Sequence, residues 1–216
     1  LCYPGFSRHH AGPSLEAPSA LEALSALARG YRQQDRHLTP ALAVTGSVGK
    51  TTTCGMIHDL LAATHRVHAP RDSFNNEIGV PITILEAPPE TEVLVLEVGT
   101  SSVGEIAART EVAQPSHGVI TAISEAHLEG LGTLEAICRE KFSLLDRLEG
   151  DQRWAPVEWR SRMGEQGSLF HWTGPSGYLE VQWQHADAVT VIDRLRGRKF
   201  DLPWALPTRW ALRCFE

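Results

Sequence analysis

The chain has 216 residues, 42% of them hydrophobic, which is enough for one sizeable α/β domain with a buried core and an appendage. Its formal net charge of −6 argues against a nonspecific nucleic-acid-binding protein, because such proteins neutralise phosphates with a positive surface. No apolar run approaches the roughly 20 residues that a bilayer span needs, and residues 1–12 lack the apolar core of a signal peptide.

The first predicted element is a helix over residues 19–33, where apolar residues recur at helical spacing. We interpret it as an amphipathic packing helix that leads into the core. It carries no residue for which we predict chemistry.

The next segment, residues 41–53, reads ALAVTGSVGKTTT and joins an apolar strand to a glycine loop. Backbone N–H groups that converge at a helix N-terminus hold phosphates, and Gly46 and Gly49 permit the tight turn that this needs. Lys50 would reach the β- and γ-phosphates, and the Thr51 hydroxyl would join a Mg²⁺ shell. The alternative is a strand-to-helix turn with an incidental Gly-Lys-Thr.

This loop is short, with two residues between its glycines where the common phosphate-binding pattern has four. The shortness indicates a subgroup of phosphate-binding proteins. We expect a nucleotide to contact Gly46, Ser47, Val48, Gly49, Lys50, Thr51 and Thr52.

From residue 41 to 150, short apolar strands alternate with helices. The strands are predicted at LAVT, VLVLEV and GVITAI, and the helices over residues 51–64 and 133–148. Such alternation predicts an α/β fold with a parallel sheet flanked by helices and with ligands at the carboxyl edge of its strands. Residues 151–216 are rich in Trp, Gly and Pro and predict a short β-rich tail, with strands over 168–172, 178–183 and 188–193.

Glu97 ends the apolar strand VLVLE, where a nucleotide-binding sheet places a carboxylate that holds Mg²⁺ directly or through water. It could instead cap the following turn. Thr100 and Ser101 follow and would place hydroxyls and backbone donors beside the metal, or they form an ordinary polar turn.

Three further features carry little weight alone. A lone histidine such as His127 is more often a surface or packing residue, and a helical lysine such as Lys141 is usually a solvated charge. Asn75 and Asn76 offer amide donors and acceptors, but an Asn-rich turn explains them equally well.

The four cysteines are widely spaced and include no Cys-x-x-Cys pair, so they indicate neither a zinc knuckle nor a disulfide framework. We expect reduced thiols and a cytoplasmic location. The chain does not begin with Met, which we interpret as the sign of a fragment or a trimmed chain.

Five segments in a fixed order carry a family resemblance: the glycine loop, NNEIGVP, VLVLEVGTSSVGEI, AISEAHLEGLGTLEAI and the helix with Lys141. Through them the chain resembles the Mur ligase family, most closely the branch that adds D-alanyl-D-alanine to the UDP-N-acetylmuramoyl tripeptide. The resemblance covers about residues 41–148 and extends weakly back to Ser19. It implies an N-terminal segment with a linker helix (1–40), an ATP-binding central domain (41–150) and a divergent or truncated β-rich remainder of that domain (151–216).

The resemblance also implies roles for single residues. His127 would be a second Mg²⁺ ligand, and a carbamylated Lys141 would supply an anionic oxygen to the same metal. Here Phe142-Ser143 follows the lysine, where relatives usually carry a small residue and an acidic one. The implied catalytic set is Lys50, Glu97, His127 and Lys141, the metal ligands are Thr51, Glu97, His127 and Lys141, and the substrate contacts are Asn75, Asn76, Thr100 and Ser101.

The implied reaction is ATP-dependent amide formation through an acyl phosphate, with ATP and Mg²⁺ as cofactors. Its partners would be a UDP-N-acetylmuramoyl peptide and a D-amino-acid dipeptide, with neither nucleic acid nor membrane.

Several features of whole relatives are missing. The family's next parallel strand, with its Asn-x-Asp-Asp signature, is not visible after Leu148, and no His-Asn motif for adenine is found before Glu216. One alternative is therefore a nucleotide-binding remnant or regulatory module without ligase activity. Another is a different phosphate-loop enzyme, but a GTPase would need an N/T-K-x-D motif and a kinase an Arg-rich lid, and neither is present.

Overall fold

The computed structural model describes residues 17–34, 39–125, 128–149, 152–161, 171–173, 179–185, 188–193 and 197–203. Its helices are α1 (Ala20–Gln34), α2 (Lys50–Leu61), α3 (Gly79–Leu85), α4 (Glu105–Ala113), α5 (Leu128–Leu131) and α6 (Leu134–Phe142). Its strands are β1 (Ala41–Thr45), β2 (Val67–His68), β3 (Val93–Glu97), β4 (His117–Ile120), β5 (Arg153–Pro156), β6 (His171–Thr173), β7 (Leu179–His185), β8 (Ala188–Asp193) and β9 (Arg198–Pro203).

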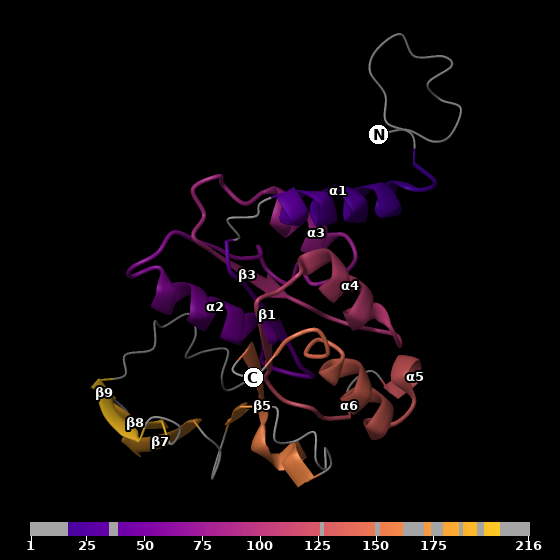
Figure 1. The fold of residues 1–216 in the computed structure, drawn as a ribbon. Coiled ribbons are helices and arrows are strands. Elements are labelled where there is room, and N and C mark those ends of the chain that lie inside the picture. Colours follow the sequence, from indigo (N-terminus) through magenta and orange to yellow (C-terminus); the bar gives the residue numbers. More distant parts are fainter. Residues whose placement is uncertain are drawn as a thin grey trace, which may run out of the picture.

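All described strands belong to one sheet, in the order β2-β3-β1-β4-β5-β6-β7-β8-β9. The neighbours from β2 to β7 pair in parallel, whereas β7, β8 and β9 form an antiparallel extension (Figure 1). After β1 the chain runs to β2, which lies beyond β3 in the sheet, whereas after β3 it crosses past β1 to β4. These two connections run in opposite directions, so a switch point lies between β1 and β3. Ligands of such sheets bind at this point.

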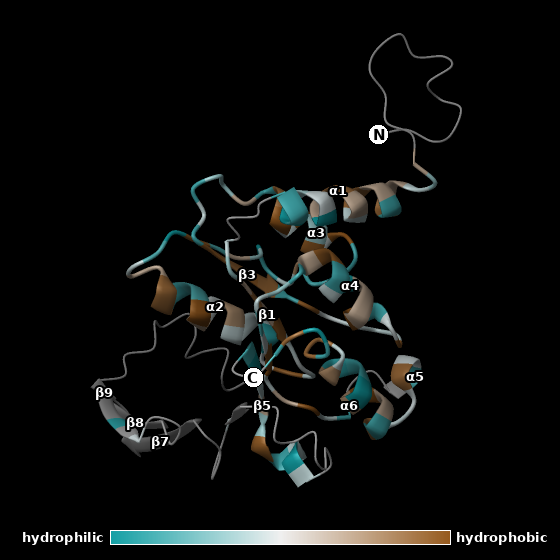
Figure 2. Ribbon diagram, in the orientation of Figure 1, coloured by the Kyte–Doolittle hydropathy of each residue, from teal (hydrophilic) through white to brown (hydrophobic). Residues whose placement is uncertain are grey.

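Helices cover both faces of the sheet because successive residues of a buried parallel strand point to opposite sides. Val44 and Val95 pack with α2 on one face. Ala41 and Leu94 pack with α1, α3 and α4 on the other face, which α6 also covers nearer β4. The strands β1 and β3 are accordingly the apolar centre of the molecule (Figure 2).

Gly118 in β4 lets the segment after α6 pack directly on the sheet. A Cβ atom there would collide with the side chains of Leu145 and Leu148. The chain leaves the α-helix after Phe142, but these leucines remain buried. This packing explains why the apolar pattern predicts a longer helix, to residue 148, than the structure contains.

The predicted α/β fold is confirmed, with one correction in the tail. We expected no visible parallel strand after Leu148, yet β5 pairs in parallel with β4. Its sequence, RWAP, has no long apolar run and no Asn-x-Asp-Asp signature, so local pattern could not reveal it. The tail strands overlap the predicted ones at β6, β7 and β8, and β9 was not predicted.

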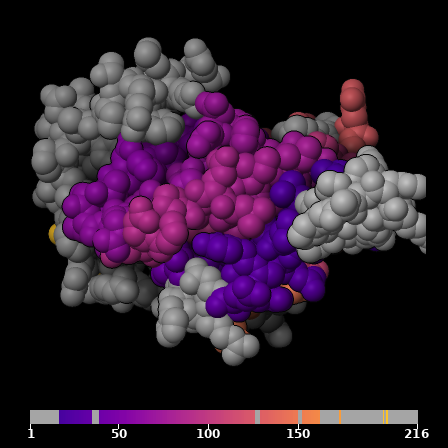
Figure 3. All heavy atoms as spheres, turned by 90° about the horizontal axis from the view of Figure 1, so that it is seen from above, coloured from indigo at the N-terminus to yellow at the C-terminus, as the bar shows by residue number. Residues whose placement is uncertain are grey.

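Helix α1 packs against α3 and α4, as predicted for a packing helix, and its indigo atoms border the magenta ones in Figure 3. Arg32 is its buried polar anchor: its guanidinium donates to the carbonyl oxygens of Ala113 at 3.0 Å, Thr39 at 3.0 Å and Gln114 at 3.2 Å. These bonds tie α1 to the end of α4 and to the start of β1. Nowhere in the described ranges is a helix both long and apolar enough to span a membrane.

We expect Arg32→Met to lower the free energy of unfolding by about 3 kcal/mol, because three carbonyl oxygens lose a charged donor while the side-chain volume is kept. The matched control is Arg29→Met on the same helix, which removes only an exposed ion pair with Glu111 and should cost less than about 1 kcal/mol. Urea unfolding at pH 7 measures both. Equal losses for the two variants would contradict the anchoring role of Arg32.

Candidate active site

The glycine loop after β1 has the backbone that the sequence predicts. Gly46 has φ 151° and Gly49 has φ 82°, values that L side chains rarely adopt. A Cβ atom on Gly46 would also collide with Thr121 and crowd the backbone of Ala122. Helix α2 begins at Lys50, so its free N–H groups face the loop, as a phosphate site requires.

The loop is tied to the segment that follows β4. The N–H of Ser47 donates to the carbonyl of Ala122 at 2.8 Å, and its hydroxyl donates to the carbonyl of Ser124 at 3.0 Å. The Ser47 hydroxyl also accepts from the N–H of Ser124, and Thr121 donates to the carbonyl of Val48 at 2.6 Å. Ser47 is therefore a buried staple of the loop, whereas the side chain of Val48 is exposed.

Lys50 lies over the loop. Its ammonium donates to the carbonyl oxygens of Gly46 at 2.9 Å and Ser47 at 3.3 Å. Burial lowers the pKa of Lys50, and the carboxylate of Glu97 opposes this shift. The cation thus lies between the loop and the end of β3.

Glu97 is the centre of the site and is only 1% exposed. One carboxylate oxygen accepts from the Thr51 hydroxyl at 2.8 Å, and the other accepts from the Asn75 amide at 2.7 Å. Asn75 in turn packs against Gly99, where a Cβ atom would lie 2.6 Å from its amide oxygen. Three segments distant in sequence therefore meet at the switch point of the sheet.

Asn76 has a local structural role. Its side-chain oxygen accepts from the N–H groups of Ile78 at 3.1 Å and Gly79 at 2.8 Å, where α3 begins. This is the Asn-rich turn that the sequence left open. A substrate contact by Asn76 stays a prediction. The side-chain NH₂ group would make this contact, because the side-chain oxygen already accepts the two bonds to the start of α3.

Thr100 and Ser101 follow β3 at the same edge. The Thr100 hydroxyl is buried and donates to the carbonyl of Ser102 at 2.7 Å, whereas the Ser101 side chain is exposed. The N–H of Ser101 donates to Glu105 at 2.7 Å. Burial alone would raise the pKa of Glu105, but this bond and the guanidinium of Arg109 outweigh it and lower the pKa.

Two buried charged residues, Arg109 and Glu140, hold these loops and were missed from the sequence. The guanidinium of Arg109 donates to the carbonyl of Gly99 at 2.6 Å and to Glu77 at 3.1 Å. The carboxylate of Glu140 accepts from the N–H of Gly104 at 2.7 Å. Both residues brace the loop between β3 and α4.

Helical spacing could have revealed these residues. Ile137 in α6 and Leu144, just after it, are buried, and Glu140 and Lys141 lie between them at the sequence spacing i, i+3, i+4, i+7. Arg109 has the same relation to buried Ile106 and Ala113 in α4. A charge at a core-facing position of an amphipathic helix is expensive to bury, so it indicates a specific partner or function.

Lys141 is 1% exposed, which excludes the solvated lysine that we considered from the sequence. Its pKa is lowered to about 8, first by burial and then by the positive charge of Lys50, while Glu140 acts in the opposite direction. No hydrogen bond or ion pair of its ammonium is found among the described residues. An amine with a pKa of about 8 is partly in its neutral form near pH 8, and this neutral form can attack CO₂.

The structure brings together most of the predicted cluster. Thr51 and Glu97 are hydrogen bonded, and Lys50 interacts electrostatically with both Glu97 and Lys141. His127 lies outside the described residues, so its place at the site is untested. Within the described part of the chain, no group of three His, Cys, Asp or Glu side chains could hold a metal ion.

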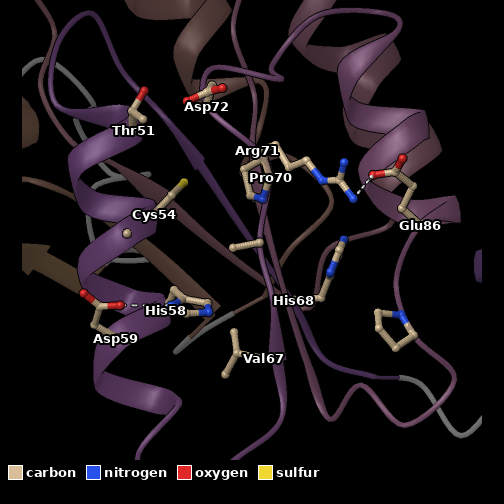
Figure 4. A pocket seen from close by; sticks show the side chains of 13 residues that line it. Thr51, Cys54, His58, Asp59, Val67, His68, Pro70, Arg71, Asp72 and Glu86 are labelled. Carbon is tan, nitrogen blue, oxygen red and sulfur yellow. Dashed lines mark hydrogen bonds and ion pairs between the residues drawn. The ribbon is translucent and has the colours of Figure 1, made fainter.

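A cavity of about 630 Å³ opens beside this cluster, between α2, β2 and the loop after β2 (Figure 4). Thr51 lines its end nearest the glycine loop. Two pairs of its lining side chains interact: His58 lies 3.0 Å from Asp59, and Arg71 lies 3.6 Å from Glu86. The cavity is thus a mixed polar groove along the helix that starts at the phosphate site.

Cys54 lines the cavity, but its thiol is poorly suited to act as a nucleophile. Neither Cys54 nor Cys138 takes part in a disulfide bond. Burial and the nearby carboxylate of Glu97 raise the pKa of Cys54 far above its usual range.

Comparison with known proteins identifies relatives of this arrangement. The Mur ligase middle domain model matches residues 44–157. The UDP-N-acetylmuramoyl-tripeptide–D-alanyl-D-alanine ligase of Bacillus subtilis (strain 168) is 44% identical over 131 residues, which are 61% of this chain and 28% of that protein. The corresponding ligase of Synechocystis sp. is 42% identical over 125 residues, or 58% of this chain and 27% of that protein.

Solved structures agree on the fold. MurF from Acinetobacter baumannii is similar with a TM-score of 0.76 and 25% identity, over 92% of this chain and 45% of that chain. MurF ligase from Thermotoga maritima in complex with ADP has a TM-score of 0.76 over 95% of this chain and 50% of that chain. The present chain therefore spans about a quarter of the length of the curated relatives and half or less of these structures.

We expect Lys141→Met to raise the free energy of unfolding at pH 7 by about 3 kcal/mol in CO₂-free buffer. The folded pKa of about 8 lies below the ordinary 10.5, so burying the ammonium carries its full cost below pH 8. That cost is lost as the pH rises from about 8 toward 10.5, because only the unfolded chain then holds the proton. The gain from the substitution should therefore disappear in this range.

Urea unfolding at a series of pH values measures this effect. Lys199→Met is the matched control, because Lys199 is an exposed residue of β9, and it should leave the pH dependence of the free energy of unfolding unchanged. A Lys141→Met variant whose stability differs from wild type by the same amount at pH 7 and pH 10.5 would show that the buried amine is not the cause.

Proposed function

The chain belongs to the Mur ligase family, and on this premise we propose that it is the nucleotide-binding part of an ATP-dependent ligase that joins a D-amino-acid dipeptide, such as D-alanyl-D-alanine, to the UDP-N-acetylmuramoyl tripeptide. The observation that carries the proposal is the buried carboxylate of Glu97, held between Thr51 and Asn75 beside the glycine loop. A strand-end carboxylate bonded to the first turn of the loop helix is suited to phosphoryl transfer.

The ATP phosphates would bind in the glycine loop. The N–H groups at the start of α2 face this loop, and the Lys50 ammonium already lies over it, where its partners among the described residues are carbonyl oxygens of the loop itself. Exchange of these carbonyl partners for phosphate oxygens requires only a side-chain movement. The remaining contacts that we propose are those of the predicted set, Gly46, Ser47, Val48, Gly49, Thr51 and Thr52.

The donor set fits Mg²⁺. Glu97 and Thr51 supply a carboxylate and a hydroxyl, the oxygen ligands that Mg²⁺ takes together with substrate phosphates and water. A bound Mg²⁺ would neutralise the charge that develops on the transferring phosphoryl group. His127 and a carbamylated Lys141 are the proposed ligands of a second ion.

The proposed chemistry has two steps. A carboxylate oxygen of the muramoyl peptide attacks the γ-phosphorus of ATP, which gives an acyl phosphate and ADP. The free amine of the dipeptide then attacks the acyl carbon, loses a proton and expels phosphate. No side-chain nucleophile is needed, so the protein supplies positioning and charge stabilisation, chiefly through Lys50.

Lys141 is proposed to react with CO₂. The ammonium first loses a proton to give the neutral amine, whose nitrogen then forms a bond to the carbon of CO₂ and releases a second proton, so that a buried cation becomes a carbamate anion. The lowered pKa supports this step, because a larger fraction of the amine is neutral and nucleophilic near pH 8. The conversion also removes the positive charge that Lys50 disfavours.

The edge loops are the proposed substrate site. Ser101 is exposed at the end of β3, and Asn75, Asn76 and Thr100 lie on the loops around it. We retain the division into a linker helix within residues 1–40, an ATP-binding unit over 41–150 and a β-rich remainder over 151–216.

One observation favours a second candidate, a nucleotide-binding module without ligase activity. Strand β5 lies parallel to β4, but its sequence contains no Asn-x-Asp-Asp signature. The two candidates share nucleotide binding and differ in turnover.

We expect the chain to bind Mg²⁺-ATP weakly and Lys50→Ala to abolish this binding, because the loop would lose the cation closest to the phosphates. Calorimetric titration measures the affinity, and circular dichroism establishes that the variant is folded. Lys199→Ala is the matched control and should bind as wild type does. Equal affinity of wild type and Lys50→Ala would remove the phosphate-loop assignment.

We expect this chain on its own to be catalytically incompetent, since domain closure normally excludes water and completes such sites. With ATP, Mg²⁺, UDP-N-acetylmuramoyl tripeptide and D-alanyl-D-alanine, it should release phosphate no faster than Lys50→Ala. Phosphate release that depends on both substrates and yields the pentapeptide product would refute this expectation. It would also exclude the module without activity.

A further inference from the structure

Helix α4 obtains its N-terminal cap from another helix. Its N-cap residue, Gly104, has no side chain to accept the free N–H groups of the first turn. The Glu140 carboxylate of α6 takes this role: one oxygen accepts from the N–H of Gly104 at 2.7 Å and the other from the N–H of Ile106 at 2.8 Å. Both bonds are charge-assisted and lie at the positive end of the helix dipole.

This carboxylate is almost fully buried. Glu140 is 4% exposed, and Lys141, the next residue of α6, is buried beside it. The two therefore occupy the core-facing side of a helix whose other buried positions, Ile137 and Phe142, are apolar. Apolar contacts are not directional, so they hold the helix against the sheet without strictly setting its rotation.

From this geometry we propose that Glu140 is a positioning residue: its two bonds to α4 set the rotation of α6 and thereby direct the Lys141 side chain into the site. Consecutive residues of an α-helix point about 100° apart. When the Glu140 side chain is held against α4, the Lys141 side chain is therefore directed toward the part of the site that contains Lys50. This inference rests on the proposed role of Lys141 in the active site.

The same contact couples two parts of the site. The N–H of Gly104 belongs to the loop that begins with Thr100 and Ser101, so Glu140 joins the proposed substrate loop to the proposed carbamate-bearing helix. A movement of α4 would therefore turn α6 and shift the Lys141 amine.

The sequence offers a direct readout because it contains only three lysines, Lys50, Lys141 and Lys199. Selective ¹³C-lysine labelling gives three side-chain NMR signals, which single variants assign. A soluble gadolinium chelate broadens signals at the surface and spares buried ones. In the wild-type chain we expect Lys199 to be broadened and Lys141 to be protected.

Glu140→Ala should increase the broadening of Lys141 several-fold, toward that of Lys199, because α6 loses the bonds that hold it in one rotation. Glu140→Gln keeps one acceptor oxygen and nearly the same volume, so its effect should be intermediate. Arg139→Ala, an exposed residue on the same helix, is the matched control and should leave Lys141 protected. Circular dichroism and thermal unfolding establish that each variant is folded.

Unchanged protection of Lys141 in folded Glu140→Ala overturns the proposal. If Glu140→Ala does not fold, Glu140→Gln decides in the same way, and protection equal to wild type overturns it.

A second arm separates this proposal from the proposed function. Mn²⁺-ATP should broaden Lys50 and Lys141 in the wild type, only Lys50 in Glu140→Ala, and Lys199 in neither. If Mn²⁺-ATP broadens no lysine while gadolinium still exposes Lys141 in Glu140→Ala, the nucleotide site falls and the positioning role stands. If Lys50 and Lys141 are broadened equally in wild type and Glu140→Ala, the nucleotide site stands and the positioning role falls.

Discussion

The arrangement of this edge of the sheet depends on one buried carboxylate. An ion in this position is tolerated only if each of its oxygens is paired, and Glu97 meets the condition with Thr51 and Asn75. The requirement brings three chain segments to one point: the first turn of α2, the loop before α3 and the end of β3. The same oxygens would later serve a cation, so the folded chain satisfies them with hydrogen bonds that an ion can replace.

Around this centre, charged side chains occupy core-facing positions that apolar side chains ordinarily occupy. Arg109, Glu140 and Lys141 occupy core-facing helix positions, and the first two bond to backbone groups of the loop between β3 and α4, although the Nε atom of Arg109 is left without a hydrogen bond within the described part of the chain. Lys141 differs, since no partner of its ammonium lies among the described residues. A helix that buries one satisfied and one unsatisfied charge side by side gives up stability at the place where chemistry is proposed.

The features that depend on residue type and spacing within one segment could be predicted from the sequence. The glycine loop, the strand VLVLE and the core strands follow from residue type and spacing, and the helical position of Glu140 was readable in the same way. The staple between Ser47 and Ser124 was not, because it joins residues 77 positions apart and neither serine has a distinctive neighbour. Strand β5 was missed for a related reason: RWAP becomes a strand through its pairing with β4.

The staple has a consequence for the thermodynamics of ligand binding. A glycine-rich loop that is free in solution must lose conformational entropy when it closes around phosphates, and this loss weakens the affinity. Here the loop is already held by Ser47 and Thr121, so most of that ordering occurs during folding. The short spacing between its glycines leaves little slack in the bound backbone. The loop is therefore preorganised for binding, and its affinity for phosphates depends on the stability of the segment at the end of β4.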